Sequence, residues 1–373
     1  MKAALKAPQS ISKWYNSCLQ KVVHSLGTGA RSRTIMIFLD KLDSTIADLP
    51  NFRKQQIYRA IFKSAYGSWD EVTSLPLGLR AQLSDTIPLA IDSKLIFSGD
   101  EKTVKALIRL DDSQYIETVL MKSNNKRNTI CVSTQVGCPM KCAFCASAKS
   151  GFTRNLSMGE IVAQILLFSR FLKSDDAKVT NIVFMGIGEP LLNYENVIGA
   201  VRLLNQESTL NLSPRRFSIS TSGILPGIER LAKEPGLEVN LAISLNAAID
   251  KKRDSLMPVN KRYPLKRLSK ALKKYFESTK RKIMIEYMLV KDTNTFKEDA
   301  VALRHFINDT EAAYVVNLIP MNDADCGFEA LSKDEIFVFR DYLKRCKISF
   351  FQRAPFGEDI GAACGQLATK EHI

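Results

Sequence analysis

The pattern of apolar and polar positions changes character about a third of the way along the chain. Residues 52–66 carry apolar side chains at helical spacing, and residues 69–83 contain a break at Pro76 and Gly78. Residues 103–121 instead hold two alternating runs, V-K-A-L-I-R-L and Y-I-E-T-V-L-M, on either side of D-D-S. We therefore expect a small helical domain followed by a β-hairpin.

From residue 129 onward, strand-like runs alternate with stretches long enough for amphipathic helices. The strand-like runs cover residues 130–134, 181–185, 216–220, 238–244, 282–289, 314–319 and 348–353. Residues 157–171 and 331–344 have apolar side chains at helical spacing. Repeated βα units imply a parallel sheet, and about six units favour an α/β fold with a partial (β/α)6, TIM-like barrel. The catalytic groups of such a barrel gather at the C-terminal ends of its strands.

These patterns predict five segments of unequal length. They are a basic N-terminal extension at 1–50, a helical accessory domain at 51–100, a β-hairpin connector at 101–126, the partial barrel at 127–353 and a C-terminal segment at 354–373.

No apolar stretch approaches the roughly 18 residues that span a bilayer, so no membrane partner is expected. Unevenly spaced cysteines and the lack of a secretory h-region favour the cytoplasm. Residues 1–39 contain no acidic side chain, which leaves a transit peptide or a basic arm open.

The formal net charge of +14 indicates a polyanionic partner. Residues 251–282 alone contain thirteen Lys or Arg against two acidic residues, and residues 1–66 contain eleven against three. A solvated helix face is the alternative interpretation, but such faces normally intersperse acidic side chains. We therefore expect both stretches to contact nucleic acid.

Three cysteines with the spacing C-x3-C-x2-C are the strongest chemical signal. Cys138, Cys142 and Cys145 lie in the run G-C-P-M-K-C-A-F-C-A, where Gly and Pro favour a loop on which three thiolates can converge. A cubane iron–sulfur cluster usually takes four thiolates, so three leave one iron open to another ligand. Cys131 would add a fourth thiol for a structural zinc, but zinc sites usually pair two C-x2-C knuckles.

A second motif, G-I-G-E-P, follows the strand-like run at 181–185. Its glycines allow a ligand to approach the backbone, and Glu189 can accept a hydrogen bond from an ammonium group. On its own the motif also describes an ordinary turn.

Together these motifs resemble the RlmN/Cfr family of radical S-adenosylmethionine RNA methyltransferases. The resemblance spans residues 127–367 and rests on six collinear motifs. They are C-V-S-T-Q-V-G-C-P-M-K-C-A-F-C at 131–145, G-F-T-R-N-L at 151–156, M-G-I-G-E-P-L-L-N at 185–193, S-I-S-T-S-G at 218–223, L-M-P-V-N at 256–260 and A-A-C-G-Q-L at 362–367.

The resemblance implies a chemistry with two sulfur atoms. Cys364 would take a methyl group from S-adenosylmethionine, and a deoxyadenosyl radical from a second molecule would activate that methyl group for addition to an adenine. Glu117 would then accept the proton from the methylated carbon. Cys131 would attack the sulfur of Cys364 and release the base as a disulfide forms.

The resemblance also implies the cofactors and partners. Cys138, Cys142 and Cys145 would hold one 4Fe-4S cluster that binds exchangeable S-adenosylmethionine, and an electron donor such as flavodoxin or ferredoxin would reduce it. The enzyme would act as a monomer. The expected contacts to S-adenosylmethionine are Gly188, Glu189, Ser220, Ser244, Leu245, Asn246 and Asn322. Asn246 stands where the family commonly has histidine, and an asparagine can keep one hydrogen bond.

The expected product is 2-methyladenosine in 23S rRNA, with a tRNA adenosine beside the anticodon as a second substrate. The alternative within the family is a Cfr-like enzyme that methylates carbon 8. The alternative from another class is a non-catalytic iron–sulfur or zinc protein that binds RNA.

Overall fold

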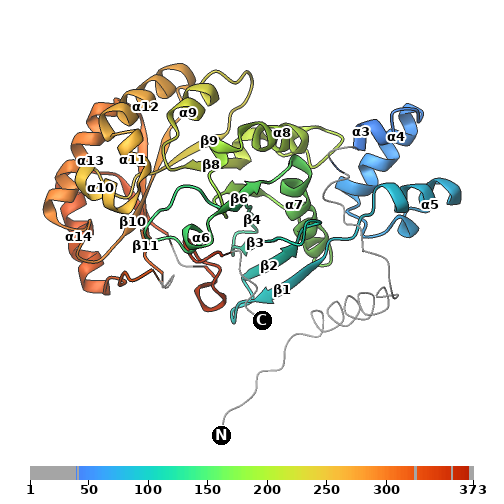
Figure 1. Cartoon of the computed structure of the whole chain (residues 1–373), viewed down its shortest axis with the longest axis horizontal. Helices are drawn as coiled ribbons and strands as arrows, with labels where there is room; N and C mark the ends of the chain where they lie inside the picture. Colours follow the sequence, from blue (N-terminus) through green and yellow to red (C-terminus); the bar gives the residue numbers. More distant parts are fainter. Residues whose placement is uncertain (1–38, 40–41, 323–325, 354–355, 369–373) are drawn as a thin grey trace, which may run out of the picture.

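The computed structural model describes residues 39, 42–322, 326–353 and 356–368 (Figure 1). A group of short helices precedes an open, largely parallel sheet whose outer face is covered by helices. Most of the predicted extension at 1–50 lies outside the described residues. Within the described ranges, no helix is long and apolar enough to cross a membrane.

The range expected for the helical accessory domain, 51–100, also contains strand β1 (Ser93–Phe97), and its helices begin earlier, at Leu42. They are α3 (Leu42–Thr45), α4 (Asn51–Tyr58), the π-helical turn η1 (Arg59–Lys63), the 3-10 turn η2 (Trp69–Glu71) and α5 (Leu77–Thr86). Trp69 is buried here, and its indole N–H donates to Ile87 O at 2.6 Å. Arg170 in α7 (Met158–Lys173) donates to Leu89 O at 2.6 Å, which ties this unit to the barrel.

One sheet of ten strands joins the hairpin to the barrel in the order β1-β2-β3-β4-β7-β8-β9-β10-β11-β12. The strands are β1 (Ser93–Phe97), β2 (Thr103–Arg109), β3 (Tyr115–Lys122), β4 (Asn128–Cys131), β7 (Asn181–Phe184), β8 (Phe217–Thr221), β9 (Asn240–Ser244), β10 (Ile283–Leu289), β11 (Tyr314–Pro320) and β12 (Phe350–Gln352). Pairing is antiparallel from β1 to β4 and parallel from β4 to β12. The hairpin therefore extends the edge of the barrel sheet through the pairing of β3 with β4.

Every strand-like run predicted after residue 129 corresponds to a parallel strand. Because β1 and β12 are the two edges, the sheet does not close, as expected for a partial barrel. A second sheet of two short strands, β5 (Gln135–Gly137) and β6 (Phe152–Asn155), brackets the cysteine loop and was not predicted.

Helices between the parallel strands pack on the outer face of the sheet (Figure 1). Besides α7 they are α8 (Tyr194–Asn205), α9 (Leu225–Leu231), α10 (Asp250–Leu256), α11 (Val259–Arg262), α12 (Leu265–Thr279), α13 (Lys297–Thr310) and α14 (Lys333–Arg345). Helix α7 begins with a capping box, in which Ser157 Oγ accepts from the Glu160 N–H and the Glu160 carboxylate accepts from the Ser157 N–H.

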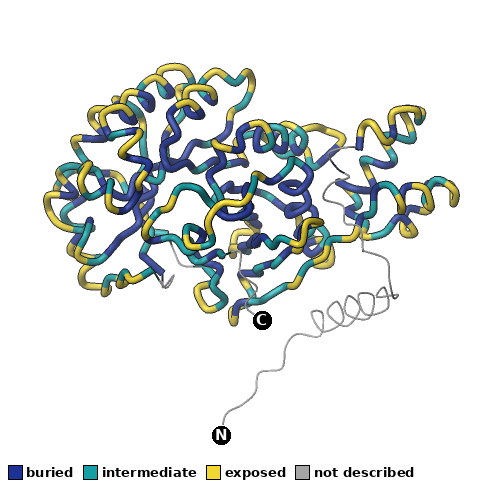
Figure 2. Tube along the Cα trace, viewed as in Figure 1, coloured by how far each residue is buried: buried dark blue, intermediate teal, exposed yellow. Residues whose placement is uncertain are grey.

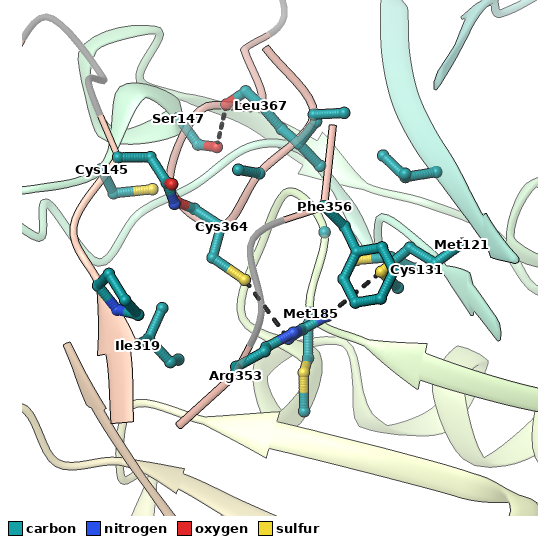
Figure 3. Close-up of a pocket in the computed structure, with 17 residues that line it drawn as sticks. Met121, Cys131, Cys145, Ser147, Met185, Ile319, Arg353, Phe356, Cys364 and Leu367 are labelled. Atoms are coloured by element: carbon teal, nitrogen blue, oxygen red, sulfur yellow. Dashed lines mark hydrogen bonds between the residues drawn. The ribbon is translucent and has the colours of Figure 1, made fainter. Parts of the chain in front are cut away.

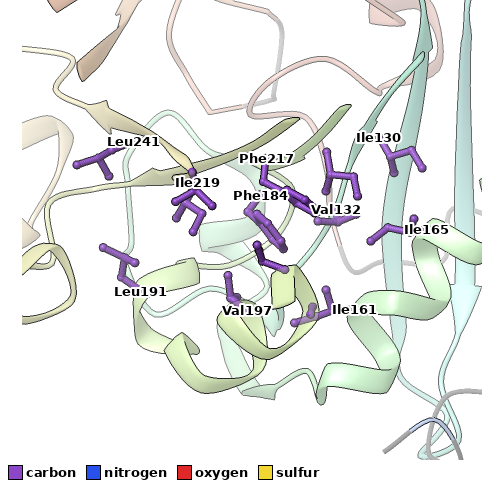
Figure 4. Close-up of a cluster of buried hydrophobic side chains, with 14 of the residues drawn as sticks. Ile130, Val132, Ile161, Ile165, Phe184, Leu191, Val197, Phe217, Ile219 and Leu241 are labelled. Atoms are coloured by element: carbon purple, nitrogen blue, oxygen red, sulfur yellow. The ribbon is translucent and has the colours of Figure 1, made fainter. Parts of the chain in front are cut away.

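The hydrophobic core lies between the strands and these helices. Figure 4 shows apolar side chains of β4, β7 and β8 meeting those of α7 and α8, among them Phe184, Phe217 and Ile161. Figure 2 shows the strands buried and the outer helix faces exposed. This core fixes the strand ends, from which the loops of the site project.

Candidate functional site

The three motif cysteines lie on the loop between β5 and α6 (Ala146–Lys149). Lys141 has a φ of 55°, so the backbone turns sharply inside this loop. Burial raises the pKa of Cys138 to about 12 and also raises the pKa of Cys142, and each of these thiols is further influenced by the charge of Cys145. A bound metal offsets such a penalty, because it holds its ligands as thiolates.

Three thiols on one loop are suitable ligands for an iron–sulfur cluster. Among the described residues, no three metal-ligating side chains are drawn together into a preformed metal site. Assignment of Cys138, Cys142 and Cys145 as cluster ligands therefore rests on their thiol chemistry and spacing.

The G-I-G-E-P loop faces this cysteine loop. Gly188 has a φ of 109°, and a Cβ there would lie 2.7 Å from Gln135 Cβ, so no other residue fits. The Glu189 carboxylate is buried and accepts from Leu191 N–H (3.1 Å), Ser222 N–H (2.8 Å) and Ser222 Oγ (2.7 Å). Burial raises the pKa of Glu189, and these donors oppose that shift. The Thr221 side chain is a fourth donor that opposes the shift.

Of the remaining expected cofactor contacts, Asn322 follows β11, and the others lie at the ends of β8 and β9. Ser220 Oγ and Ser244 Oγ are 3.3 Å apart across the two strands. Asn246 has a φ of 57°, and its side chain accepts from Met288 N–H (2.9 Å) and donates to Met257 Sδ (3.4 Å). Both ends of the Asn246 amide thus already have partners within the protein, and Leu245 beside it is buried.

Arg253 was counted in the sequence only as one of the basic residues at 251–282. Its side chain is fully buried, and it donates to Leu245 O (3.1 Å), Ser222 O (2.7 Å) and Asn260 Oδ1 (2.8 Å). Burial lowers the pKa of Arg253 to about 10, and the charge of Cys142 opposes that shift. The guanidinium therefore joins the loops after β8 and β9 to each other, close to the cysteine loop.

Glu286 and Asn317 form a second buried polar pair that was not predicted. They are paired in register on β10 and β11, and Asn317 Nδ2 donates to Glu286 Oε2 at 2.6 Å. Within the described part of the chain, Glu286 Oε1 and Asn317 Oδ1 have no hydrogen-bond partner. Burial raises the pKa of Glu286 to about 7.

A cavity brings together sulfur atoms from distant parts of the sequence (Figure 3). Cys131 at the end of β4, Cys364 in the C-terminal segment and Cys145 of the cysteine loop all line it, together with Asn322 and Arg353. Asn322 Nδ2 donates to Cys364 O at 3.3 Å. Cys131 and Cys364 are free thiols here, and burial raises the pKa of Cys131 to about 12. The expected disulfide is thus not formed in this state.

The C-terminal segment is held between the cysteine loop and the hairpin. Ala146 N–H donates to Gly365 O (2.8 Å), and Ser147 Oγ donates to Leu367 O (2.7 Å). On the other side, Lys105 Nζ lies 3.3 Å from Gly361 O. Contacts from both sides thus position Cys364.

Glu117 on β3 lies beneath this segment. Its Oε1 is 3.0 Å from Lys105 Nζ, and its Oε2 accepts from Ala368 N–H at 2.7 Å. The residue is 6% exposed and is not among those that line the cavity. Each carboxylate oxygen of Glu117 thus has a partner within the protein.

The basic run at 251–282 is not a single charged surface. Arg253 is buried, Lys252 pairs with Asp299 (2.8 Å), and Lys273 pairs with Glu311 (2.6 Å). Exposed basic side chains remain along α11 and α12, namely Lys261, Arg262, Lys266, Arg267, Lys270 and Lys274. Arg267, Lys270 and Lys274 line a surface groove between α9 and α12.

Comparisons with known proteins agree with the motifs. The Radical SAM superfamily matches residues 132–304. A probable dual-specificity RNA methyltransferase RlmN of Staphylococcus haemolyticus is 40% identical over 86% of this chain and 87% of its own length. The dual-specificity RNA methyltransferase RlmN of Nautilia profundicola is 38% identical over 90% of this chain and 98% of its own. The crystal structure of a radical SAM methyltransferase from Sphaerobacter thermophilus has a TM-score of 0.85 at 39% identity, covering 89% of this chain and 98% of that one.

Proposed function

Because the chain belongs to the RlmN family of radical S-adenosylmethionine RNA methyltransferases, we propose that it methylates carbon 2 of an adenine in 23S rRNA. A tRNA adenosine beside the anticodon is the proposed second substrate. The observation that supports this best is the cavity that contains Cys131, Cys364 and Cys145. Two thiols next to the cysteine loop suit a methyl carrier and a second sulfur that releases it.

The proposed cofactor is one 4Fe-4S cluster on Cys138, Cys142 and Cys145, with S-adenosylmethionine at its open position. When bound, the cluster supplies the electron for reductive cleavage of S-adenosylmethionine, and flavodoxin or ferredoxin is the proposed donor to it. Glu189 is the proposed partner of the ammonium group of S-adenosylmethionine, and Ser220, Ser244 and Asn322 are the proposed hydrogen-bond partners at the neighbouring strand ends.

The protein residues divide the remaining work. Cys364 accepts the methyl group as a thiolate, and Asn322 holds its backbone through the carbonyl. Glu117 takes the proton from the base once Ala368 has withdrawn, while its other carboxylate oxygen stays 3.0 Å from Lys105 Nζ. Cys131 then displaces the methylated base from Cys364.

Mass spectrometry of RNA nucleosides tests this proposal. A strain that lacks the gene should lose 2-methyladenosine from 23S rRNA and tRNA, and the wild-type gene should restore it. The gene with Cys364→Ala is the matched control and should not. Loss of 8-methyladenosine instead would show that the enzyme methylates carbon 8. Restoration of 2-methyladenosine by Cys364→Ala would show that Cys364 does not carry the methyl group.

A further inference from the structure

An arginine lies between the two cysteines of the cavity. Arg353 follows β12, and its backbone N–H donates to Leu318 O at 3.0 Å. Its side chain extends into the cavity, with Nη1 3.6 Å from Cys364 Sγ and Nη2 3.3 Å from Met121 Sδ (Figure 3). The guanidinium thus contacts the sulfur atom that the proposed reaction methylates.

Arg353 carries the charge of this cavity. Among the described residues that line it, Arg353 has the sole charged side chain, and it forms no ion pair with a described carboxylate. The groups that influence its ionisation are Cys364 and Cys131, with Glu286 on β10, while Arg127 lies at longer range. The charge of Cys364 is the largest cause that raises the pKa of Arg353.

The chemistry of the two sulfurs requires such a charge. A thiolate, not a thiol, attacks a sulfonium methyl group or another sulfur. In the methyl transfer, the Cys364 thiol first loses its proton to solvent. The bond from sulfonium sulfur to methyl then breaks as the bond from Cys364 Sγ to methyl forms, and the negative and positive charges cancel. Arg353 Nη1, 3.6 Å from Cys364 Sγ, offers that thiolate a positively charged hydrogen-bond donor.

We propose that Arg353 is a further catalytic residue, which contacts Cys364 Sγ and balances the negative charge of the sulfur during methyl transfer. This inference rests on the proposed function, because it takes Cys364 as the methyl carrier. Cys131 benefits from the same charge when it attacks Cys364. The contact to Met121 holds the guanidinium on the hairpin side of the cavity, where it faces both sulfurs.

The test compares Arg353→Met and Arg353→Lys with the wild-type holoenzyme. Preparations with unmodified Cys364 are mixed anaerobically with S-adenosylmethionine without reductant, and peptide mass spectrometry follows methylation of Cys364 over a range of pH. We expect Arg353→Met to methylate Cys364 about tenfold more slowly near neutral pH, as expected for loss of one opposite charge beside an ionising group. The deficit should shrink as the pH rises. Arg353→Lys, which keeps the charge but not the planar fork, should be intermediate.

Iron content separates this role from a structural one. It should stay near the wild-type value in Arg353→Met. A parallel loss of iron and of methylation at every pH would overturn the proposal, as would methylation of Cys364 at the wild-type rate.

Alkylation of the thiols distinguishes this inference from the proposed function. If the wild-type enzyme never methylates Cys364, the methyl-carrier function fails, but iodoacetamide still measures how readily Cys131 and Cys364 ionise. Slower alkylation of both in Arg353→Met would support the charge role by itself. Equal alkylation rates would reject it.

Discussion

The two halves of the site differ in how they are held. The cofactor half consists of the cysteine loop, Glu189 and Arg253, and its buried polar groups are fixed by several hydrogen bonds to strand-end loops. The sulfur half consists of Cys131, Cys364 and the residues around them. Its C-terminal segment has no strand among its described residues and is attached by hydrogen bonds to the start of α6, to the hairpin and to Asn322.

This difference suggests a division of roles. Side chains that are each fixed by several hydrogen bonds suit the binding of a cofactor, because they need not reorganise to orient it in every catalytic cycle. A segment whose described residues form only the short turn η5 (Glu358–Ile360) can detach without breaking the sheet, as Ala368 must for Glu117 to meet a base. We therefore expect substitutions in the cofactor half to stop every step of the reaction. Substitutions in the sulfur half should block one step and leave the earlier steps intact.

Removing one thiol from the cysteine loop should give the largest effect. Cys138→Ala, Cys142→Ala or Cys145→Ala should each lose the cluster, because two thiolates cannot retain it against solvent. Iron analysis and deoxyadenosine formation after anaerobic reconstitution measure this. Cys346→Ala, which removes a cysteine outside the cavity, is the control and should keep both. Wild-type deoxyadenosine formation in any of the three variants would show that the ligand assignment is wrong.

Removing Cys131 should stop the reaction at one step and leave earlier steps intact. If Cys364 carries the transferred carbon, the protein and the adenine become joined through a thioether, and attack by a second thiolate separates them. Cys131→Ala should therefore accumulate a protein–RNA adduct, seen on denaturing gels as a shifted band that ribonuclease removes.

The double variant Cys131→Ala with Cys364→Ala is the matched control for that adduct. It should form no shifted band, because the attachment point is missing, while cluster content stays normal. Full turnover by Cys131→Ala, or the same band from the double variant, would contradict the assignment of these two residues.

Glu286 should make the stability of the barrel depend on pH. Its pKa is raised from 4.5 to about 7 in the folded protein, so the folded state holds this proton more tightly than the unfolded state does. The free energy of unfolding should therefore fall as the pH rises from about 4.5 to about 7, by roughly 3 kcal/mol at most. Glu286→Gln should remove this dependence and be the more stable protein at pH 8, as measured by urea denaturation. Parallel pH profiles for the two proteins would contradict the shift.

The sequence predicted what local patterns encode. Alternation and helical spacing located each parallel strand, because burial on one or both faces leaves a periodic trace. The cysteine loop was readable because its ligands are close together in the chain. The short pair β5 and β6 left no such trace, since three or four residues cannot show a period.

Contacts between distant segments could not be predicted from spacing. Nothing local relates Arg353 to Cys364 and Met121, and Cys364 itself was identified only through the family resemblance. Counting charges also could not distinguish the buried Arg253 from the exposed basic residues around it. The distinction depends on the carbonyl groups that surround the guanidinium in the fold.

The exposed basic residues of α12 should give the smallest effect, because they lie outside both halves of the site. In a βα unit the helix after a strand begins near the C-terminal end of that strand, so Lys266, Arg267, Lys270 and Lys274 extend from the site face along α12. Changing these four to Gln should weaken RNA binding and flatten the log–log dependence of affinity on salt by about 0.7 to 0.9 per lost phosphate contact. The control removes the same charge at the opposite edge of the sheet, by changing Lys280 and Lys282 after α12, Lys344 in the last turn of α14 and Lys347 just after it. Filter binding from low to high salt should show a reduced slope for the first set alone. Equal slopes in the two sets would mean that α12 presents an ordinary solvated face.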